Sequence, residues 1–125
     1  NEPISPVSVY GKTKAKGEEL VFLNQPNAVI LRTSWLYSKF GNNFMKTMIR
    51  LSKERKELRV IYDQIGTPTW ARDLADVCLL VALNNELSGI YHYSNEGVAS
   101  WYDFACDIVQ AHNPSVKVYP IETKD

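Results

Sequence analysis

The stretch Ala28-Val29-Ile30-Leu31-Arg32-Thr33-Ser34 decides the fold. It opens with a short, uninterrupted apolar run, which is typical of a parallel strand covered on both faces. Polar side chains follow at once, where the strand ends. In open α/β sheets, ligands bind beyond the carboxyl ends of the strands, so this end is a candidate binding edge.

Helical and strand patterns alternate on both sides of this strand, and no linker, repeat or low-complexity segment interrupts them. We expect helices over Val7–Leu23, Phe44–Arg55, Ala71–Leu83 and Trp101–Ala111, strands over Ala28–Leu31, Leu58–Ile61, Gly89–Tyr93 and Val116–Tyr119, and irregular structure over Asp63–Trp70. The alternation predicts an α/β fold with parallel pairing, and residues 1–125 are treated as a single α/β unit.

Spacing within the helical segments also predicts which residues face the core and where the last helix begins. Phe44, Met48 and Leu51 repeat at helical spacing and should face the core. Ser100 and Asp103 have the spacing of a capping box at the start of the last helix.

The two cysteines, Cys78 and Cys106, each lie inside an apolar helical pattern and match no metal or redox motif. We expect buried, reduced thiols, as in a cytoplasmic protein. His92 and His112 have no second ligand one helical turn away, so no metal site is expected around them.

Composition narrows the function classes. Fourteen basic residues balance fourteen acidic ones, so no net field attracts the chain to nucleic acid or to an anionic membrane. No apolar run approaches the ~20 residues that span a bilayer. The hydrophobic share of 45% is typical of a globular protein with a packed core.

Tyr10 and Lys14 carry the strongest chemical signal. They stand one turn apart on the same face of the first expected helix. A free tyrosine has a pKa of about 10, and a nearby ammonium group favours the phenolate and lowers that pKa. The spacing therefore suits a proton donor near neutral pH. A surface tyrosine among exposed lysines is the alternative, because the bare spacing is common.

Three stretches together resemble a known family. They are Tyr10 to Glu18, then Leu31-Arg32-Thr33-Ser34-Trp35-Leu36-Tyr37 with Gly41-Asn42-Asn43-Phe44, and then Asp63-Gln64-Ile65-Gly66-Thr67-Pro68-Thr69. In this order they resemble the dTDP-4-dehydrorhamnose reductases, within the extended short-chain dehydrogenase/reductases. The resemblance implies part of a Rossmann-like doubly wound sheet, together with the C-terminal nucleotide-sugar-binding region.

The resemblance also implies roles for single residues. Tyr10 is the expected proton donor and also a cofactor-binding residue, and Lys14 is expected to tune it and to bind the nicotinamide ribose of NADPH or NADH. Thr33 and Ser34 are expected at the nicotinamide end of the cofactor. Trp35 is expected against the dTDP-sugar, with core packing as its alternative. For Arg32 we prefer a buried structural ion pair.

Three further residues match family motifs around the nucleotide-sugar. Asn43, Gln64 and Thr67 are candidate substrate-binding residues in expected loops, where binding groups are common. For Asn43 the equal alternative is a helix N-cap.

Arg72 departs from the resembled pattern. Some members carry there a glutamate that helps bind magnesium at a dimer interface, and a cation repels a metal ion. We therefore expect no magnesium bridge, while a homodimer of another kind stays open.

The glycine content points to a missing part. The six glycines form no G-x-G-x-x-G pattern, so the phosphate-binding turn of a dinucleotide site is absent from these residues. By the resemblance, the N-terminal dinucleotide-binding half and a further catalytic Ser or Thr lie upstream. The alternatives to a reductase are another extended-family epimerase or dehydratase, or a non-catalytic regulatory subunit with this fold.

Overall fold

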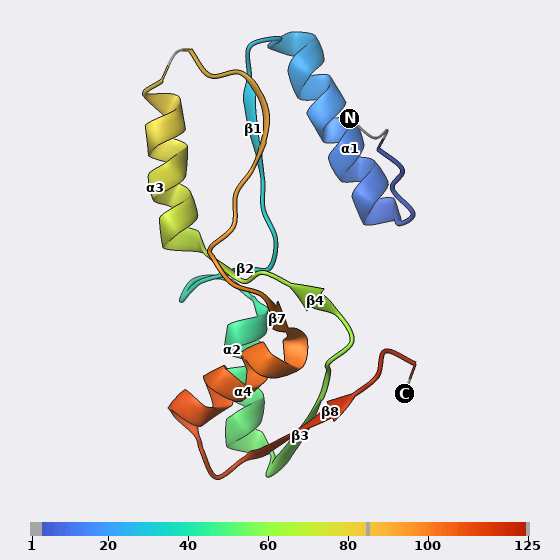
Figure 1. The fold of residues 1–125 in the computed structure, drawn as a ribbon, viewed down its shortest axis with the longest axis vertical. Helices are drawn as coiled ribbons and strands as arrows, with labels where there is room; N and C mark the ends of the chain where they lie inside the picture. The colour runs from blue at the N-terminus through green and yellow to red at the C-terminus, as the bar shows by residue number, and fades with distance from the viewer. Residues whose placement is uncertain (1–3, 85, 125) are drawn as a thin grey trace.

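The computed structural model describes residues 4–84 and 86–124, and it has two lobes stacked along the long axis of the molecule (Figure 1). The first lobe contains α1 (Val9–Asn24), β1 (Val29–Arg32), α3 (Ala71–Ala82) and β6 (Gly89–His92). The second lobe contains α2 (Phe44–Glu54), β3 (Glu57–Ile61), α4 (Trp101–His112) and β8 (Lys117–Ile121). The short strands are β2 (Leu36–Tyr37), β4 (Ile65–Gly66), β5 (Thr69–Trp70) and β7 (Ala99–Ser100). The expected α/β class is confirmed.

The first lobe is built on one parallel strand pair. β1 pairs with β6 in a register that sets Arg32 opposite His92 at the carboxyl ends of the strands. Figure 1 shows α1 and α3 on opposite sides of this pair, which is the layering that an α/β fold requires of a parallel sheet. The predicted strand is therefore present, with its bounds shifted by one residue to Val29–Arg32, and its carboxyl end points toward the second lobe (Figure 1).

The second lobe holds the buried apolar core of the described residues. The parallel pair β3 and β8 lies against α4, and α2 packs on α4. The buried apolar side chains are Met48, Leu58, Val60, Ala105, Ile108, Val109 and Val116. Phe44 and Leu51 pack against this core partly buried, so the predicted apolar face of α2 is confirmed.

A capping box starts α4, as the sequence predicts. The Ser100 hydroxyl accepts a hydrogen bond from the Asp103 amide at 3.0 Å, and Asp103 Oδ2 accepts one from the Ser100 amide at 2.8 Å. Hydrogen bonds from the Ser100 hydroxyl and then from its amide hold the pKa of Asp103 below its usual value. Both amides are thereby satisfied at a helix end that contributes to the core.

The expectation for Asp63–Trp70 was wrong in part. The segment contains two short strands: β4 pairs with β7 antiparallel, and β5 pairs with β2 in parallel. Gly66 and Pro68 limit each strand to two residues, but partners distant in sequence still supply the hydrogen bonds. The β2–β5 pair lies where the two lobes meet (Figure 1).

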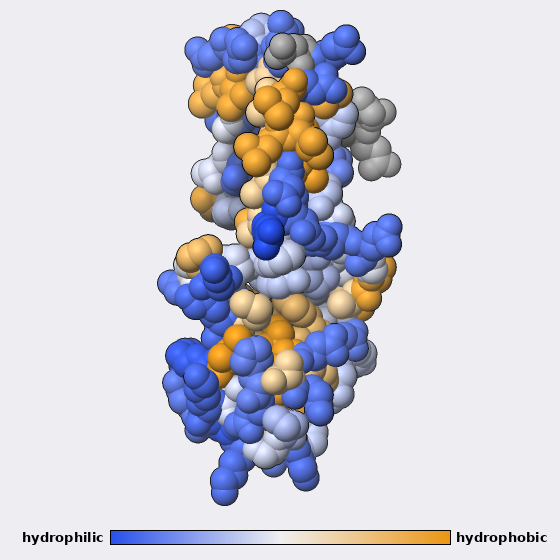
Figure 2. Space-filling view, turned by 90° about the vertical axis from the view of Figure 1, so that its left-hand side faces the viewer, coloured by the Kyte–Doolittle hydropathy of each residue, from blue (hydrophilic) through white to orange (hydrophobic). Residues whose placement is uncertain are grey.

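The expected burial of Cys78 was also wrong, because Cys78 is exposed, while Cys106 is half-buried. The inner face of α3 lines a hollow of about 640 Å³ with Val29 and Leu31 of β1. Figure 2 shows apolar surface gathered on the α3 side of the first lobe. The exposed apolar residues on α3 and directly after it include Leu79, Leu80 and Leu83.

None of the described helices combines the length and the apolar character that a membrane span needs.

Candidate active site

The first turn of α1 fixes Tyr10 and Lys14 in space. Ser8 caps the helix, since its hydroxyl accepts a hydrogen bond from the Gly11 amide at 3.0 Å. Tyr10 and Lys14 then stand one turn apart, and the Tyr10 side chain is 75% exposed. The phenol is therefore open to a ligand rather than held in a core.

A groove of about 840 Å³ runs between α1 and the end of β1, and we call it the α1–β1 groove. One wall is the inner face of α1, with Tyr10, Thr13, Lys14, Gly17, Glu18 and Val21. The other wall is the stretch from Ile30 to Leu36. Tyr10, Lys14, Thr33, Ser34 and Trp35, all predicted as site residues, line this one groove.

A second hollow continues the groove across the end of β6. It has a volume of about 370 Å³ and is lined by Arg32, Thr33, Ser34, His92, Tyr93 and Ser94. Sequence reasoning considered His92 only as a metal ligand and did not single out Tyr93 or Ser94, although the parallel register of β1 and β6 brings this strand end beside Arg32. Both hollows lie where ligands bind in open α/β sheets.

The hydrogen bond of Ser34 defines what its hydroxyl can still do. Ser34 Oγ donates to the Thr67 carbonyl oxygen at 2.7 Å. A hydroxyl has a single proton, so the remaining lone pairs of Oγ are available only as acceptors. The same bond ties the end of β1 to the loop between β4 and β5.

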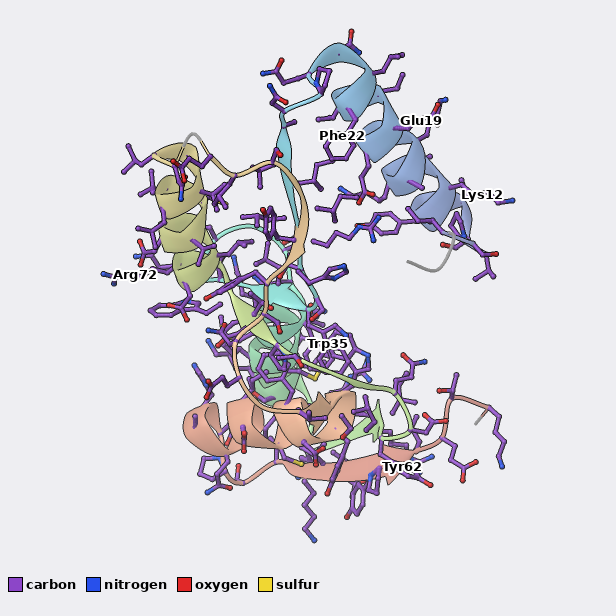
Figure 3. The ribbon with its side chains drawn as sticks, turned by 45° about the horizontal axis from the view of Figure 1, so that its top comes forward. Lys12, Glu19, Phe22, Trp35, Tyr62 and Arg72 are labelled. Atoms are coloured by element: carbon purple, nitrogen blue, oxygen red, sulfur yellow. The ribbon has the colours of Figure 1, made fainter. Side chains whose placement is uncertain are left out.

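Trp35 lies at the junction of the two lobes (Figure 3). Its indole stacks on Trp101, with ring centroids 3.6 Å apart and an angle of 12° between the planes. Its backbone has φ of 46°, the left-handed region that side chains rarely adopt. Trp35 therefore packs against α4, which was the alternative expectation, and it also lines the groove, while its contact with a sugar stays a prediction.

Gly66 lies in close contact with the Trp35 ring. A Cβ added at Gly66 would lie 2.6 Å from Trp35 Cε2. We expect Gly66→Ala to displace the ring and lower the free energy of unfolding by about 1–3 kcal/mol, the usual scale of overpacking. Thermal unfolding followed by tryptophan fluorescence measures this. Gly17→Ala is the control, because no atom beyond its chain neighbours and the adjoining backbone of its own helix lies within 4 Å of its added Cβ, and alanine favours a helix. An unchanged midpoint in Gly66→Ala would contradict the tight contact.

The other substrate-binding candidates do not line the groove. Asn43 is the N-cap of α2, with Oδ1 accepting from the Lys46 amide at 3.1 Å, which is the alternative that the sequence left open. Gln64 Nε2 donates to Thr123 Oγ1 at 3.1 Å, and Thr67 Oγ1 donates to the Gly97 carbonyl oxygen at 3.0 Å. These contacts hold loops in place.

Arg32 forms the structural ion pair that the sequence favours, but the pair is partly exposed rather than buried as expected. Arg32 Nε and Nη2 donate to the two carboxylate oxygens of Glu18 at 2.9 and 2.5 Å. The hydrogen bond from Arg32 holds the pKa of Glu18 below its usual value, although burial opposes this. Sequence reasoning missed Glu18, yet Tyr10, Lys14 and Glu18 follow one another at one-turn intervals.

The described residues contain no cluster of three or more His, Cys, Asp or Glu side chains that could hold a metal ion. Arg72 is exposed on the first turn of α3, and its guanidinium carbon lies 5.8 Å from the centroid of the Trp70 ring. Figure 3 shows Arg72 pointing away from both lobes.

Comparison with known proteins gives a consistent set of relatives. Residues 1–125 match the family model described as the RmlD substrate binding domain. The chain is 51% identical over 105 residues to a dTDP-4-dehydrorhamnose reductase of Salmonella typhimurium, covering 81% of this chain and 35% of that protein. It is 41% identical over 125 residues to the spore coat polysaccharide biosynthesis protein SpsK of Bacillus subtilis, covering all of this chain and 44% of that protein.

A solved structure supports the same family. A dTDP-4-dehydrorhamnose reductase of Bacillus anthracis, crystallised in complex with NADP, superposes with a TM-score of 0.93 at 45% identity. The match covers 98% of this chain and 44% of that chain. The chain thus spans less than half the length of the relatives it matches.

Proposed function

The chain belongs to the family of RmlD substrate-binding domains, and from this membership and the α1–β1 groove we propose that it forms part of a reductase. The proposed reaction converts dTDP-4-dehydro-6-deoxy-L-mannose to dTDP-L-rhamnose with NADPH or NADH. The observation that carries the proposal is that Tyr10, Lys14, Thr33, Ser34 and Trp35 line one groove. The relatives named as reductases favour this reaction over a dehydratase, an epimerase or a regulatory subunit.

The donor set of the groove fits the nicotinamide end of such a cofactor. Lys14 offers an ammonium group to ribose hydroxyls, and Ser34 offers lone pairs to the N–H groups of a carboxamide. A bound reduced nicotinamide supplies a hydride to the carbonyl carbon of the sugar. No backbone turn of the G-x-G-x-x-G type is present in these residues to hold its pyrophosphate.

Tyr10 completes the reduction. When the carbonyl carbon accepts a hydride, its oxygen gains negative charge, and the Tyr10 hydroxyl donates a proton to that oxygen. The product is a neutral alcohol and a phenolate. Lys14, one turn along α1, stabilises the phenolate because opposite charges attract at short range. Reprotonation from solvent restores Tyr10, which is exposed.

We test this function in the parent polypeptide, meaning the natural protein in which these residues occur, at its full length. Incubation with the 4-keto sugar and NADPH or NADH should oxidise one cofactor for each dTDP-L-rhamnose formed. Cofactor oxidation is followed by absorbance and the product by chromatography. A sugar that is converted without net cofactor oxidation would instead support an epimerase or a dehydratase.

Trp35 is proposed to contact the sugar through the part of the ring that Trp101 leaves open. We expect Trp35→Ala to raise KM for the sugar about tenfold, equivalent to about 1.4 kcal/mol of lost binding, with cofactor affinity nearly unchanged. Trp101→Leu is the control, since it removes the stack and Trp101 does not line the groove. An equal rise of KM in both variants would favour packing as the only role of Trp35.

Arg72 is proposed to exclude a magnesium bridge between subunits. Calorimetric titration of the parent polypeptide with magnesium should show no specific site, and a chelator should leave its association state unaltered, because a guanidinium repels the ion. Arg72→Glu serves as the comparison, since it supplies a carboxylate at the same exposed place. A dimer that dissociates on chelation would overturn this proposal.

A further inference from the structure

The ion pair between Arg32 and Glu18 joins α1 to the end of β1. Both carboxylate oxygens of Glu18 accept a hydrogen bond from the guanidinium, at 2.9 and 2.5 Å. The two side chains are only partly exposed, at 31% for Arg32 and 18% for Glu18. A two-pronged guanidinium–carboxylate contact of this kind is directional as well as attractive.

Little else of polar character holds α1 in place. Its other side-chain hydrogen bonds among the described residues stay within the helix: Thr13 to the Tyr10 carbonyl, Lys16 to Glu19, and Asn24 to the Leu20 carbonyl. No residue of the helix is fully buried. The pair is therefore the polar tie between the helix that carries Tyr10 and Lys14 and the strand end that carries Thr33 and Ser34.

Glu18 also lies close to the cation of the site. It is one turn beyond Lys14 on the same helical face, and the charge of Lys14 contributes to the lowered pKa of Glu18, after the larger effect of Arg32. The charged and titratable groups that face Glu18 are Arg32 from β1, Lys14 from its own helix and His92 from β6. With both oxygens of Glu18 bound to Arg32, Lys14 has no salt-bridge partner within residues 4–84 and 86–124.

We propose that Arg32 is a positioning residue that occupies the Glu18 carboxylate and so keeps it from pairing with Lys14. The Lys14 ammonium then stays available to Tyr10 and to a cofactor in the α1–β1 groove. The inference rests on the proposed function of that groove. It differs from a general stabilising role. Without Arg32, the weaker cofactor binding is attributed to the free Glu18 carboxylate, which then pairs with Lys14.

The pairing itself is tested by zero-length carbodiimide cross-linking of the parent polypeptide, in which an amide forms only between a carboxylate and an amine in contact. In Arg32→Met we expect a several-fold increase in the Lys14–Glu18 cross-link, read by peptide mass spectrometry. The Lys16–Glu19 pair, at 2.6 Å in the same helix, is the internal standard and should react equally in both proteins. Equal Lys14–Glu18 yields with and without Arg32 would overturn the proposal.

The functional consequence is tested by NADPH affinity, which needs no turnover. Arg32→Met should weaken binding about tenfold, the scale of one lost charge-assisted contact. The double variant Arg32→Met/Glu18→Gln should recover most of that loss, because no free carboxylate remains. Arg50→Met removes an exposed Arg–Glu pair on α2 and controls for a general loss of charge. Circular dichroism checks that each variant is folded.

The outcomes separate this proposal from the one on which it rests. A double variant as weak as Arg32→Met, or weaker, would overturn the positioning role and leave the reductase proposal intact. Failure of the unsubstituted parent polypeptide to bind either NADPH or NADH would overturn both. Binding of NADPH without reduction of the 4-keto sugar would overturn the proposed reaction, while the cross-linking and affinity results would still decide the role of Arg32.

Discussion

Tyr10→Phe in the parent polypeptide is expected to lower kcat by about 10²-fold or more, the usual scale of positioned acid catalysis. The substitution removes the hydroxyl proton that the alkoxide oxygen needs and leaves the ring in place. NADPH affinity should change little, because Lys14, Thr33 and Ser34 still line the groove. Steady-state kinetics with the 4-keto sugar, together with a cofactor titration, measure both quantities.

A matched control is available for that variant. Tyr119 lies on β8 in the second lobe and does not line the α1–β1 groove. Tyr119→Phe should therefore keep the kcat of the unsubstituted protein. Near-normal turnover in Tyr10→Phe would remove the proton-donor role from this account.

The isolated chain of 125 residues is expected to show no reductase activity and only weak NADPH binding. Tyr10, Lys14 and the strand end at Thr33 can hold only the nicotinamide half of the cofactor. The pyrophosphate needs backbone amides of a glycine-rich turn at a helix N-terminus, and none of the six glycines forms one. Fluorescence titration with NADPH, beside the parent polypeptide, measures the difference.

Weak retention of the nucleotide-sugar by the isolated chain is compatible with this expectation, since Trp35 and the following loops are present. Micromolar NADPH binding together with turnover by the isolated chain would contradict it. In that case these residues would bind the pyrophosphate in a way that the fold does not indicate.

Much of the fold follows from local patterns. The apolar run at Ala28 to Leu31 gives β1 within one residue, and the capping signal at Ser100 and Asp103 starts α4 as predicted. These features depend on residues close in sequence. The sequence also predicted that Tyr10, Lys14, Thr33 and Ser34 would lie together, because one helical turn or one strand end fixes their positions, and all four line one groove. Their roles in binding and catalysis stay predictions.

Contacts between distant segments could not be predicted in the same way. The stack of Trp35 on Trp101 and the close contact of Gly66 with the Trp35 ring join three segments far apart in sequence. The role of Glu18 depends on Arg32, fourteen residues later and on another element. Cys78 was expected to be buried because its helix has an apolar stripe, but the structure leaves that stripe on an open hollow.

Transfer of deuterium tests the central claim, that the α1–β1 groove belongs to a carbonyl reductase, most directly. The parent polypeptide is supplied with the 4-keto dTDP-sugar and NADPH deuterated on the nicotinamide ring, and the product is examined by NMR and mass spectrometry. We predict one deuterium on the former carbonyl carbon of dTDP-L-rhamnose, with a rate that falls in Tyr10→Phe and not in Tyr119→Phe. Deuterium at another carbon, or a converted sugar without any deuterium, would contradict the account.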